Sequence, residues 1–266
     1  IQKGDKIRAF INIKGLNDEE FVNSHFLVFA TRNGLIKKTP LEAYSRPRTN
    51  GIIAISMRED DQLIKVALTD GKSEILVASR QGKVVRFNEE TVRPMGRPAT
   101  GVRAIQLEEN ADDYVVGMIC VEKHSPETVL VISENGYGKR TALDDENGEP
   151  IYRITNRGGK GVRTMNLTEK TGRLIAIDAV IDEFDLMLIN KSGTAIRMAM
   201  SDIRVMGRAT QGVKLIELQK RNDQLMFGCV VPKEEENSSE KTNGEEETVT
   251  GEDGTNFVST TEENND

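Results

Sequence analysis

The sequence predicts an all-β fold built from repeated, propeller-like blades. The first observation is a repeated unit: a short apolar run, a turn containing glycine, and a second short run that ends in Lys or Arg. The second is spacing, because the unit occurs four times at intervals of roughly 50 residues, the length of one four-stranded blade. The third is composition, since the runs are rich in Val and Ile and too short for typical helices. The turn glycines are Gly34, Gly82, Gly136 and Gly193.

Each repeat opens with a predicted β-hairpin, because two short apolar runs flank a turn signal. Asn33-Gly34 and Asn135-Gly136 give the strongest signals, since a type I′ turn needs positive φ at both central residues. The four hairpins are expected over residues 25–38, 74–86, 129–140 and 185–197.

A basic loop with a fixed glycine follows each hairpin. In three repeats the loop aligns without gaps around Gly101, Gly161 or Gly212. Each of these three loops has a base eight residues before the glycine, another four before it and a third two after it. The first repeat is looser, with Arg46 and Arg48 in its loop. The repetition indicates a shared structural position for these bases.

A hydrophobic strand after a short polar turn closes each repeat. These strands are expected over residues 61–68, 113–120, 172–178 and 223–230. A fifth strand of this kind, at residues 5–11, exceeds the number of hairpins, so we expect residues 1–13 to end an upstream blade. The hairpin, the strand after the basic loop and the closing strand supply four strands per repeat. We therefore expect blades over about residues 14–68, 69–122, 123–180 and 181–232.

The net charge of −7 over 266 residues conceals two opposed parts. Residues 233–266 contain 12 acidic and 2 basic residues, whereas residues 1–232 contain 31 acidic and 34 basic ones. A segment as polar as residues 233–266 cannot bury a core, so we expect a disordered acidic tail. The remaining body is mildly basic, which leaves a polyanionic partner open. Residues 144–150 are also acidic and rich in turn residues, and predict an exposed loop.

The composition excludes several classes of protein. No apolar run approaches the 18 or so residues of a membrane helix, and the start resembles no signal peptide, so we expect a cytoplasmic protein without a membrane partner. Cys120 and Cys229 give neither a disulfide framework nor a zinc quartet, and we expect buried thiols. His25 and His124 each stand alone, and no carboxylate stands at one position of all four repeats, as a metal-binding ring would need. We therefore expect no catalytic residue, metal or cofactor in this chain.

Recurring Lys and Arg residues form the candidate binding site. If the repeats stack in register, equivalent bases form an arc along one edge, which matches the closely spaced phosphates of a bent duplex. Trp is absent and no aromatic residue recurs beside the bases, which argues against single strands, and nothing resembles a recognition helix. We predict sequence-independent contact with the duplex backbone. The predicted DNA-binding residues are Lys37, Lys38, Arg46, Arg48, Arg86, Arg93, Arg97, Arg103, Lys139, Arg140, Arg153, Arg157, Lys160, Arg163, Arg197, Arg204, Arg208 and Lys214.

Residues 82–87, 135–141 and 206–213 resemble the C-terminal domain of the A subunit of bacterial DNA gyrase, a type IIA topoisomerase, and the similarity covers roughly residues 1–231. The resemblance implies a β-pinwheel, a propeller variant, usually of six blades, whose blades exchange strands. The four complete repeats then correspond to the last four blades. The resemblance also implies a function, because this family wraps duplex DNA around a basic rim so that gyrase introduces negative supercoils using ATP.

One departure from the family pattern concerns its hallmark motif, Q-R-R-G-G-[KR]-G on the first blade. The nearest match, residues 156–161, is one base short and lies in the third complete repeat, so we interpret it as a related blade loop. We expect the intact motif and the DNA-cleaving tyrosine upstream. The resemblance then implies no topoisomerase activity for this chain alone, with ATP and Mg²⁺ bound elsewhere in the holoenzyme. The implied partners are duplex DNA, the N-terminal part of the gyrase A protein and the gyrase B protein, in an A2B2 holoenzyme.

Two other functions fit parts of the pattern. The matching domain of the C protein of topoisomerase IV has similar blades, and an intact upstream motif would favour gyrase over it. A protein-binding propeller scaffold would present aromatic or apolar anchors on one face, whereas this sequence repeats Arg and Lys. For the acidic tail, we hypothesise that it competes with DNA for the basic rim.

Overall fold

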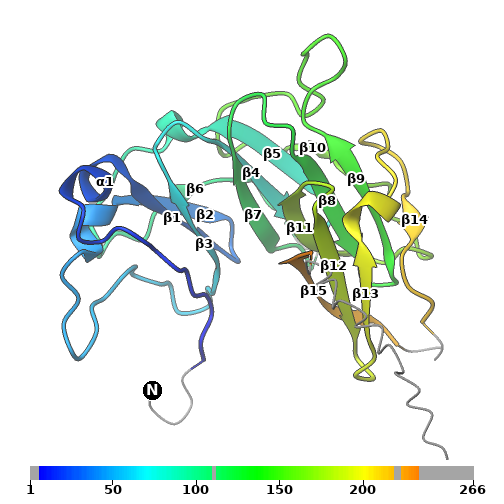
Figure 1. The fold of residues 1–266 in the computed structure, drawn as a ribbon, viewed down its shortest axis with the longest axis horizontal. Coiled ribbons are helices and arrows are strands. Elements are labelled where there is room, and N and C mark those ends of the chain that lie inside the picture. Colours follow the sequence, from blue (N-terminus) through cyan, green and yellow to red (C-terminus); the bar gives the residue numbers. More distant parts are fainter. Residues whose placement is uncertain (1–5, 110–111, 219–222, 234–266) are drawn as a thin grey trace, which may run out of the picture. The chain divides into compact units, whose positions relative to one another are not determined.

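A computed structural model describes residues 6–109, 112–218 and 223–233, and in this part of the chain the all-β prediction is confirmed. Figure 1 shows antiparallel sheets that follow one another along the chain. Three of them have four strands and one has three. The one α-helix of the described residues, α1 (Glu19–Ser24), is capped by the Asp18 carboxylate. Of the predicted disordered tail, residues 233–266, all but Lys233 lie outside the described residues.

The four hairpins stand at the predicted positions. Their strands are β1 (Phe26–Thr31) with β2 (Leu35–Pro40), β4 (Glu74–Ser79) with β5 (Lys83–Asn88), β8 (Thr128–Ser133) with β9 (Tyr137–Ala142), and β12 (Phe184–Asn190) with β13 (Ala195–Ala199). The 3-10 turns η1 (Leu41–Tyr44), η2 (Glu89–Thr91) and η3 (Met200–Asp202) follow β2, β5 and β13.

The turn type differs from the prediction. Among the described residues, His124 alone has positive φ without being glycine, so Asn33 and Asn135 do not form type I′ turns. Gly34 and Gly136 have φ of 82° and 81°, and each ends a three-residue loop between its strands. A type I turn followed by a left-handed glycine has this geometry. The extra loop residue lets the glycine alone supply the positive φ.

The closing strands are also confirmed. They are β3 (Leu63–Thr69), β7 (Val115–Val121), β11 (Leu174–Val180) and β15 (Leu225–Pro232). Each pairs antiparallel with the first strand of its own hairpin. The closing strands of successive sheets contact one another, β3 with β7, β7 with β11 and β11 with β15. One edge of every sheet is therefore a closing strand, and the basic loops belong to the opposite edge.

The strand after each basic loop pairs differently from the prediction. Three two-residue strands occupy this position: β6 (Val102–Arg103), β10 (Val162–Arg163) and β14 (Val213–Lys214). They join β2, β5 and β9 of the preceding repeat, which gives the sheet orders β3-β1-β2-β6, β10-β5-β4-β7 and β11-β8-β9-β14. Each four-stranded sheet thus combines strands from two consecutive repeats. The fourth sheet, β13-β12-β15, has three strands among the described residues.

The prediction of a strand at residues 5–11 is wrong for residues 6–11, which are the ones that the structure describes. Residues 6–13 contain no strand, and the side chains of Ile7 and Phe10 are 73% and 93% exposed. A strand is stabilised by pairing with a neighbour, and no hairpin precedes these residues in the described part of the chain.

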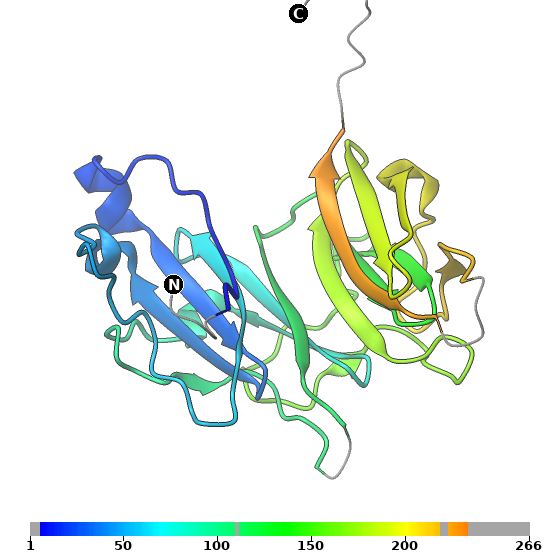
Figure 2. The ribbon, with the colours of Figure 1, turned by 90° about the horizontal axis from the view of Figure 1, so that it is seen from below.

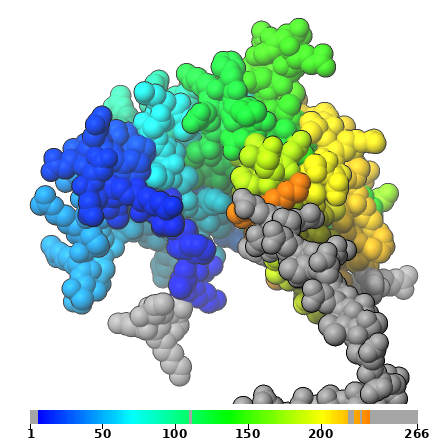
Figure 3. Space-filling model, in the orientation of Figure 1, coloured from blue at the N-terminus to red at the C-terminus, as the bar shows by residue number. Residues whose placement is uncertain are grey.

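Hydrophobic cores fill the spaces between successive sheets. In β4, Ile75 and Val77 pack with Val28 of the first sheet, whereas Leu76 packs with Val129 of the third. Alternate residues of a strand point to opposite faces, so a strand buried on both faces reads as the continuous apolar run seen in the sequence. Figure 2 shows the sheets packed in chain order, and Figure 3 shows the same succession as adjoining colour bands.

Candidate nucleic-acid interface

Three basic loops, here called the rim loops, cross the hairpin of the preceding repeat. They comprise residues 93–103, 153–163 and 204–214. One backbone N–H of each loop donates to the carbonyl of the last base of that hairpin. These bonds join Met95 to Lys38 at 2.7 Å, Thr155 to Arg86 at 2.9 Å and Met206 to Arg140 at 2.8 Å. The rim loops are therefore attached to the sheets by backbone contacts, which fixes the positions from which their side chains leave.

The fixed glycine of each rim loop is required by a close approach to this hairpin. All three glycines have positive φ, and a Cβ on any of them would lie 2.5–2.6 Å from a backbone oxygen of the hairpin. A side chain has no room there, and a left-handed conformation is unfavourable for other residues. The contacts are Gly101 to Ile36, Gly161 to Val84 and Gly212 to Gly138.

Five of the predicted DNA-binding side chains are buried, which corrects the expectation for them. A cation whose donors already face protein oxygens has none left for a phosphate. Arg86 is 2% exposed and lies between the carboxylates of Glu74, at 2.5 Å, and Asp144, at 3.1 Å. It also donates to the carbonyl of Tyr152. The five residues are Lys37, Lys38, Arg86, Lys139 and Arg140.

The last base of each hairpin pairs with a nearby acid, and this pairing repeats in all four hairpins. Its members are Lys38 with Glu89 at 3.6 Å, Arg86 with Glu74, Arg140 with Asp182 at 2.5 Å, and Arg197 with Asp185 at 2.8 Å. Arg197 differs from the other three because a third of its side chain is exposed. The repeated base that ends each hairpin is thus explained by contacts within the sheet and its loops.

Lys37 and Lys139 occupy equivalent places three residues after a turn glycine, and both are fully buried. The Lys37 ammonium donates to the carbonyls of Ala54 and Arg97 at 2.6 and 2.5 Å. Burial, followed by the charge of Arg97, lowers the pKa of Lys37 to about 8. Burial, followed by the charge of Arg208, lowers the pKa of Lys139 to about 8 as well. Each lysine thus binds the backbone of the rim loop that crosses its own hairpin.

Two of the arginines four residues before the fixed glycines join neighbouring rim loops. Arg157 is half-buried and donates to the carbonyls of Thr91 and Arg103, both at 3.2 Å. Arg208 is half-buried and donates to the carbonyl of Arg163 at 2.5 Å. Arg97, their counterpart in the first rim loop, is also half-buried. These guanidinium groups are engaged, at least in part, with the protein backbone.

The remaining predicted bases are exposed, and the fold brings most of them together on the rim loops. Arg103, Arg163 and Lys214 stand on β6, β10 and β14, the strands that each join the sheet of the preceding repeat and are here called the exchanged strands. The Lys214 ammonium pairs with the Glu217 carboxylate at 2.6 Å. Arg163 lies 3.5 Å from the Asn166 amide oxygen. The exposed bases without a side-chain partner among the described residues are Arg46, Arg48, Arg93, Arg103, Arg153, Lys160 and Arg204.

One base of this surface, Lys83, is not among the predicted DNA-binding residues. Lys83 directly follows the turn glycine of the second hairpin, and its Cα is the ladder partner of Arg163 in β10. Lys83 also lines a hollow of about 490 Å³ together with Lys160, Glu108 and Glu109. In the sequence, the position of Lys83 beside the turn glycine is the only sign that it belongs to this surface. That sign can be interpreted only when β10 is known to pair with β5 at Lys83.

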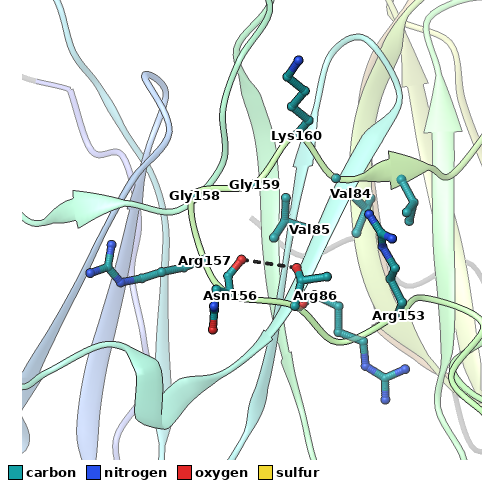
Figure 4. A pocket seen from close by; sticks show the side chains of 12 residues that line it. Val84, Val85, Arg86, Arg153, Asn156, Arg157, Gly158, Gly159 and Lys160 are labelled. Atoms are coloured by element: carbon teal, nitrogen blue, oxygen red, sulfur yellow. Dashed lines mark hydrogen bonds between the residues drawn. The ribbon is translucent and has the colours of Figure 1, made fainter.

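The middle rim loop covers a hollow of about 380 Å³. It is lined by Val84, Val85 and Arg86 of the hairpin and by Arg153 and residues 155–162 of the loop. Figure 4 shows the side chains of Arg153, Arg157 and Lys160 leaving this loop in different directions. They therefore do not converge on one bound group, and their arrangement suits contacts spread along an extended ligand.

Chemistry other than binding has little support in the described residues. No group of three His, Cys, Asp or Glu side chains in this part of the chain is arranged to hold a metal ion. Burial raises the pKa of the Cys120 thiol, which makes it a poor nucleophile. His25 stacks on Phe21, and the exposed His124 lies 3.4 Å from the Asp144 carboxylate. No described helix combines the length and the apolar character needed to cross a bilayer.

Comparisons with known proteins agree with this geometry. A family model of the DNA gyrase C-terminal domain, a beta-propeller, matches residues 25–70, 73–122, 127–181 and 185–227. The DNA gyrase A protein of Staphylococcus aureus strain NCTC 8325 is 43% identical over 257 residues, and that of strain MRSA252 is 44% identical over 255. These matches cover 96% of this chain and 27% of the length of those proteins.

Solved structures share the fold. The C-terminal domain of DNA topoisomerase IV aligns with a TM-score of 0.70 and 24% identity, covering 80% of this chain and 64% of that one. A DNA gyrase A C-terminal domain aligns with a TM-score of 0.65 and 24% identity, covering 78% of this chain and 66% of that one. With the family model matched in all four repeats, the chain belongs to the DNA gyrase C-terminal domain family.

Proposed function

We propose that this chain binds duplex DNA without sequence preference and wraps it along the rim loops. The observation that carries the proposal is the set of exposed bases that the three equivalent loops hold at equivalent positions on one edge of successive sheets. Phosphates follow one another along the duplex in the same regular way. Such contacts fix the path of the backbone and do not read bases.

Binding across a salt series tests this proposal. The chain is titrated against random-sequence linear duplexes and against single strands of the same length. The proposal predicts a steep loss of duplex affinity with salt, because each phosphate contact releases counterions, and little difference between duplex sequences. A shallow salt dependence, or equal affinity for single strands, would contradict it.

We further propose that the chain serves DNA gyrase as part of its A protein, in the cytoplasm, together with the N-terminal part of the same polypeptide and the gyrase B protein. The sequence identity to gyrase A proteins over nearly the whole chain supports this assignment. The gyrase A proteins matched at 43% and 44% identity also support gyrase over topoisomerase IV. Adding the chain to a gyrase whose A protein lacks this domain tests the assignment, and restored supercoiling is the expected result.

For the acidic residues 233–266 we propose competition with DNA for the rim. The tail carries 12 acidic and 2 basic residues against the basic body. Deleting it should tighten duplex binding at low salt, and the gain should shrink as salt screens the charges. A chain of full length with Gln in place of every tail Glu separates charge from length. Unchanged affinity in both variants would contradict competition.

A further inference from the structure

The three rim loops differ in what lies beneath them. Lys37, in the first hairpin, and Lys139, in the third, each place a buried ammonium under a rim loop. The Lys37 ammonium donates to the Arg97 carbonyl at 2.5 Å. The Lys139 ammonium donates to the carbonyls of Gly207 and Arg208, both at 2.6 Å. In both cases the ammonium binds the backbone of the arginine four residues before the fixed glycine.

The second hairpin has Val85 at the equivalent place, three residues after its turn glycine. Val85 faces Val77 in the ladder, as Lys139 faces Val131 and Lys37 faces Phe29, so the three positions share one register. Where the first and third hairpins supply an ammonium, the second leaves the hollow of about 380 Å³. Residues 155–162 line that hollow, and in the part of the chain that the structure describes no lysine donates a hydrogen bond to them.

We propose that Lys37 and Lys139 are positioning residues of the DNA-binding rim, and that Val85 leaves the rim loop at residues 153–163 to be ordered by the DNA itself. This inference rests on the proposed function. The two lysines hold the rim loops at residues 93–103 and 204–214 in their binding conformation before DNA arrives. The middle loop lacks such an ammonium beneath its central residues and loses more conformational freedom on binding.

Remaining contacts explain why the middle loop stays in place without a lysine. Its Gly158 N–H donates to the Ala104 carbonyl at 2.6 Å, and its Gly159 carbonyl accepts from the Gln106 N–H at 2.9 Å. Arg157 donates to the Arg103 carbonyl at 3.2 Å. These bonds run to the neighbouring segment, and the two ends of the loop are bonded to the hairpin beneath through Thr155 and Val162. Among the described residues, no side chain of that hairpin donates a hydrogen bond to residues 156–161 between them.

The positioning role has a signature that a phosphate contact lacks. The two ammonium groups are buried and bind carbonyl oxygens, so removing one changes no ionic contact with DNA. The affinity for duplex DNA should fall by the same factor at every salt concentration. The slope of log affinity against log salt concentration, here called the salt slope, should therefore not change. Replacing an exposed base of the rim loops removes one phosphate contact instead, and this reduces the magnitude of the salt slope by about one.

Hydrogen exchange in the free chain gives the first measurement. Amides of residues 157–161 should exchange at least several-fold faster than those of residues 207–212, and saturation with a random-sequence duplex should slow the former more. Lys139→Met should accelerate exchange at residues 207–212. Val85→Lys, which places an ammonium in the hollow, should slow exchange at residues 157–161. Equal exchange in the two wild-type loops, or no change in Val85→Lys, would overturn the proposal.

Duplex binding across a salt series gives the second measurement. Lys139→Met should weaken binding several-fold, Val85→Lys should tighten it several-fold, and both should keep the wild-type slope. Lys160→Met is the matched control, because it makes the same chemical change at an exposed site, and it should lower the slope without altering exchange at residues 207–212. A lower slope in Lys139→Met would overturn the positioning role. If Lys139→Met does not fold, Val85→Lys still decides the case.

The two arms separate this inference from the proposed function. Exchange in the free chain does not depend on DNA, so the lysine contacts are tested even if the wild-type chain fails to bind duplex. Absent duplex binding would contradict the proposed function. Normal binding with unchanged exchange in all variants would contradict the positioning role alone.

Discussion

Arg157 donates from Nη1 to the carbonyl oxygen of Arg103 at 3.2 Å. The two arginines belong to neighbouring rim loops, and the next pair repeats the contact, with Arg208 donating to Arg163. The arginine four residues before the fixed glycine thus holds the backbone of the base two residues after the preceding glycine. The bases of the rim loops therefore fall into two groups. Those four residues before the fixed glycine are half-buried, and two of them hold the backbone of a neighbouring loop, whereas those two residues after the glycine are exposed.

Arg103 and Arg157 should respond differently to the same substitution. Arg103→Gln should lower the salt slope of duplex binding by about one unit, because the residue is exposed and contributes one phosphate contact. Arg157→Gln should destabilise the fold by about 1–2 kcal/mol through lost charged hydrogen bonds and lower the slope less. Salt-series titration and urea unfolding of both variants provide the comparison. A larger slope change in Arg157→Gln than in Arg103→Gln would contradict the division of roles.

Arg86 is predicted to be a stability residue. Arg86→Met leaves the Glu74 carboxylate, 3% exposed, without its partner at 2.5 Å. Breaking one side of a buried ion pair costs about 3–5 kcal/mol, so the urea midpoint should fall accordingly. Arg93→Met, at an exposed base of a rim loop, is the control and should alter stability by less than about 0.5 kcal/mol. Similar unfolding of the two variants would show that burial does not distinguish these arginines.

Gly161 tests the close approach between a rim loop and its hairpin. Gly161→Ala should destabilise the chain by more than about 2 kcal/mol, because a left-handed alanine costs about 1 kcal/mol and its Cβ would lie 2.6 Å from the Val84 carbonyl. Gly51→Ala is the control, since Gly51 also has positive φ, 77°, but open space at its Cβ. Equal destabilisation by thermal or urea unfolding would mean that the contact at Val84 is absent.

Lys139 should make stability depend on pH. Its pKa is about 8 in the folded chain and near 10.4 when unfolded, so the unfolded state binds more protons between these values. Stability therefore rises with pH across that window. Between pH 7.5 and 9.5 the free energy of unfolding of the wild type, relative to Lys139→Met, should rise by about 1–2 kcal/mol. A flat or falling difference in urea unfolding at the two pH values is the contrary outcome.

Much of the fold was predictable because its signals are local. Val- and Ile-rich runs on either side of Gly34, Gly82, Gly136 and Gly193 specify hairpins, and polar turns before apolar runs specify the closing strands. The partner of a two-residue strand was not predictable in this way. Val102–Arg103 pairs with the preceding hairpin because Gly101 allows its backbone to approach Ile36, which is a contact between residues far apart in the sequence.

The candidate site was predictable as a set of loops and not as a set of side chains. Lys37 and Arg93 are both bases of the repeat in the sequence, yet one is fully buried in a strand and the other exposed in a rim loop. Their exposure differs because the rim loop of the next repeat covers the hairpin strand that carries Lys37. An acid twelve residues before the base, as Glu74 precedes Arg86 and Asp185 precedes Arg197, was a usable signal of internal pairing.

The linking number of a sealed plasmid tests wrapping most directly. A nicked plasmid is ligated with increasing amounts of the chain, the protein is removed, and the topoisomers are separated. Because wrapped DNA is held in writhe, we expect a shift in linking number that grows with bound chain and diminishes in Arg103→Gln. An unchanged topoisomer distribution at saturating binding would contradict wrapping.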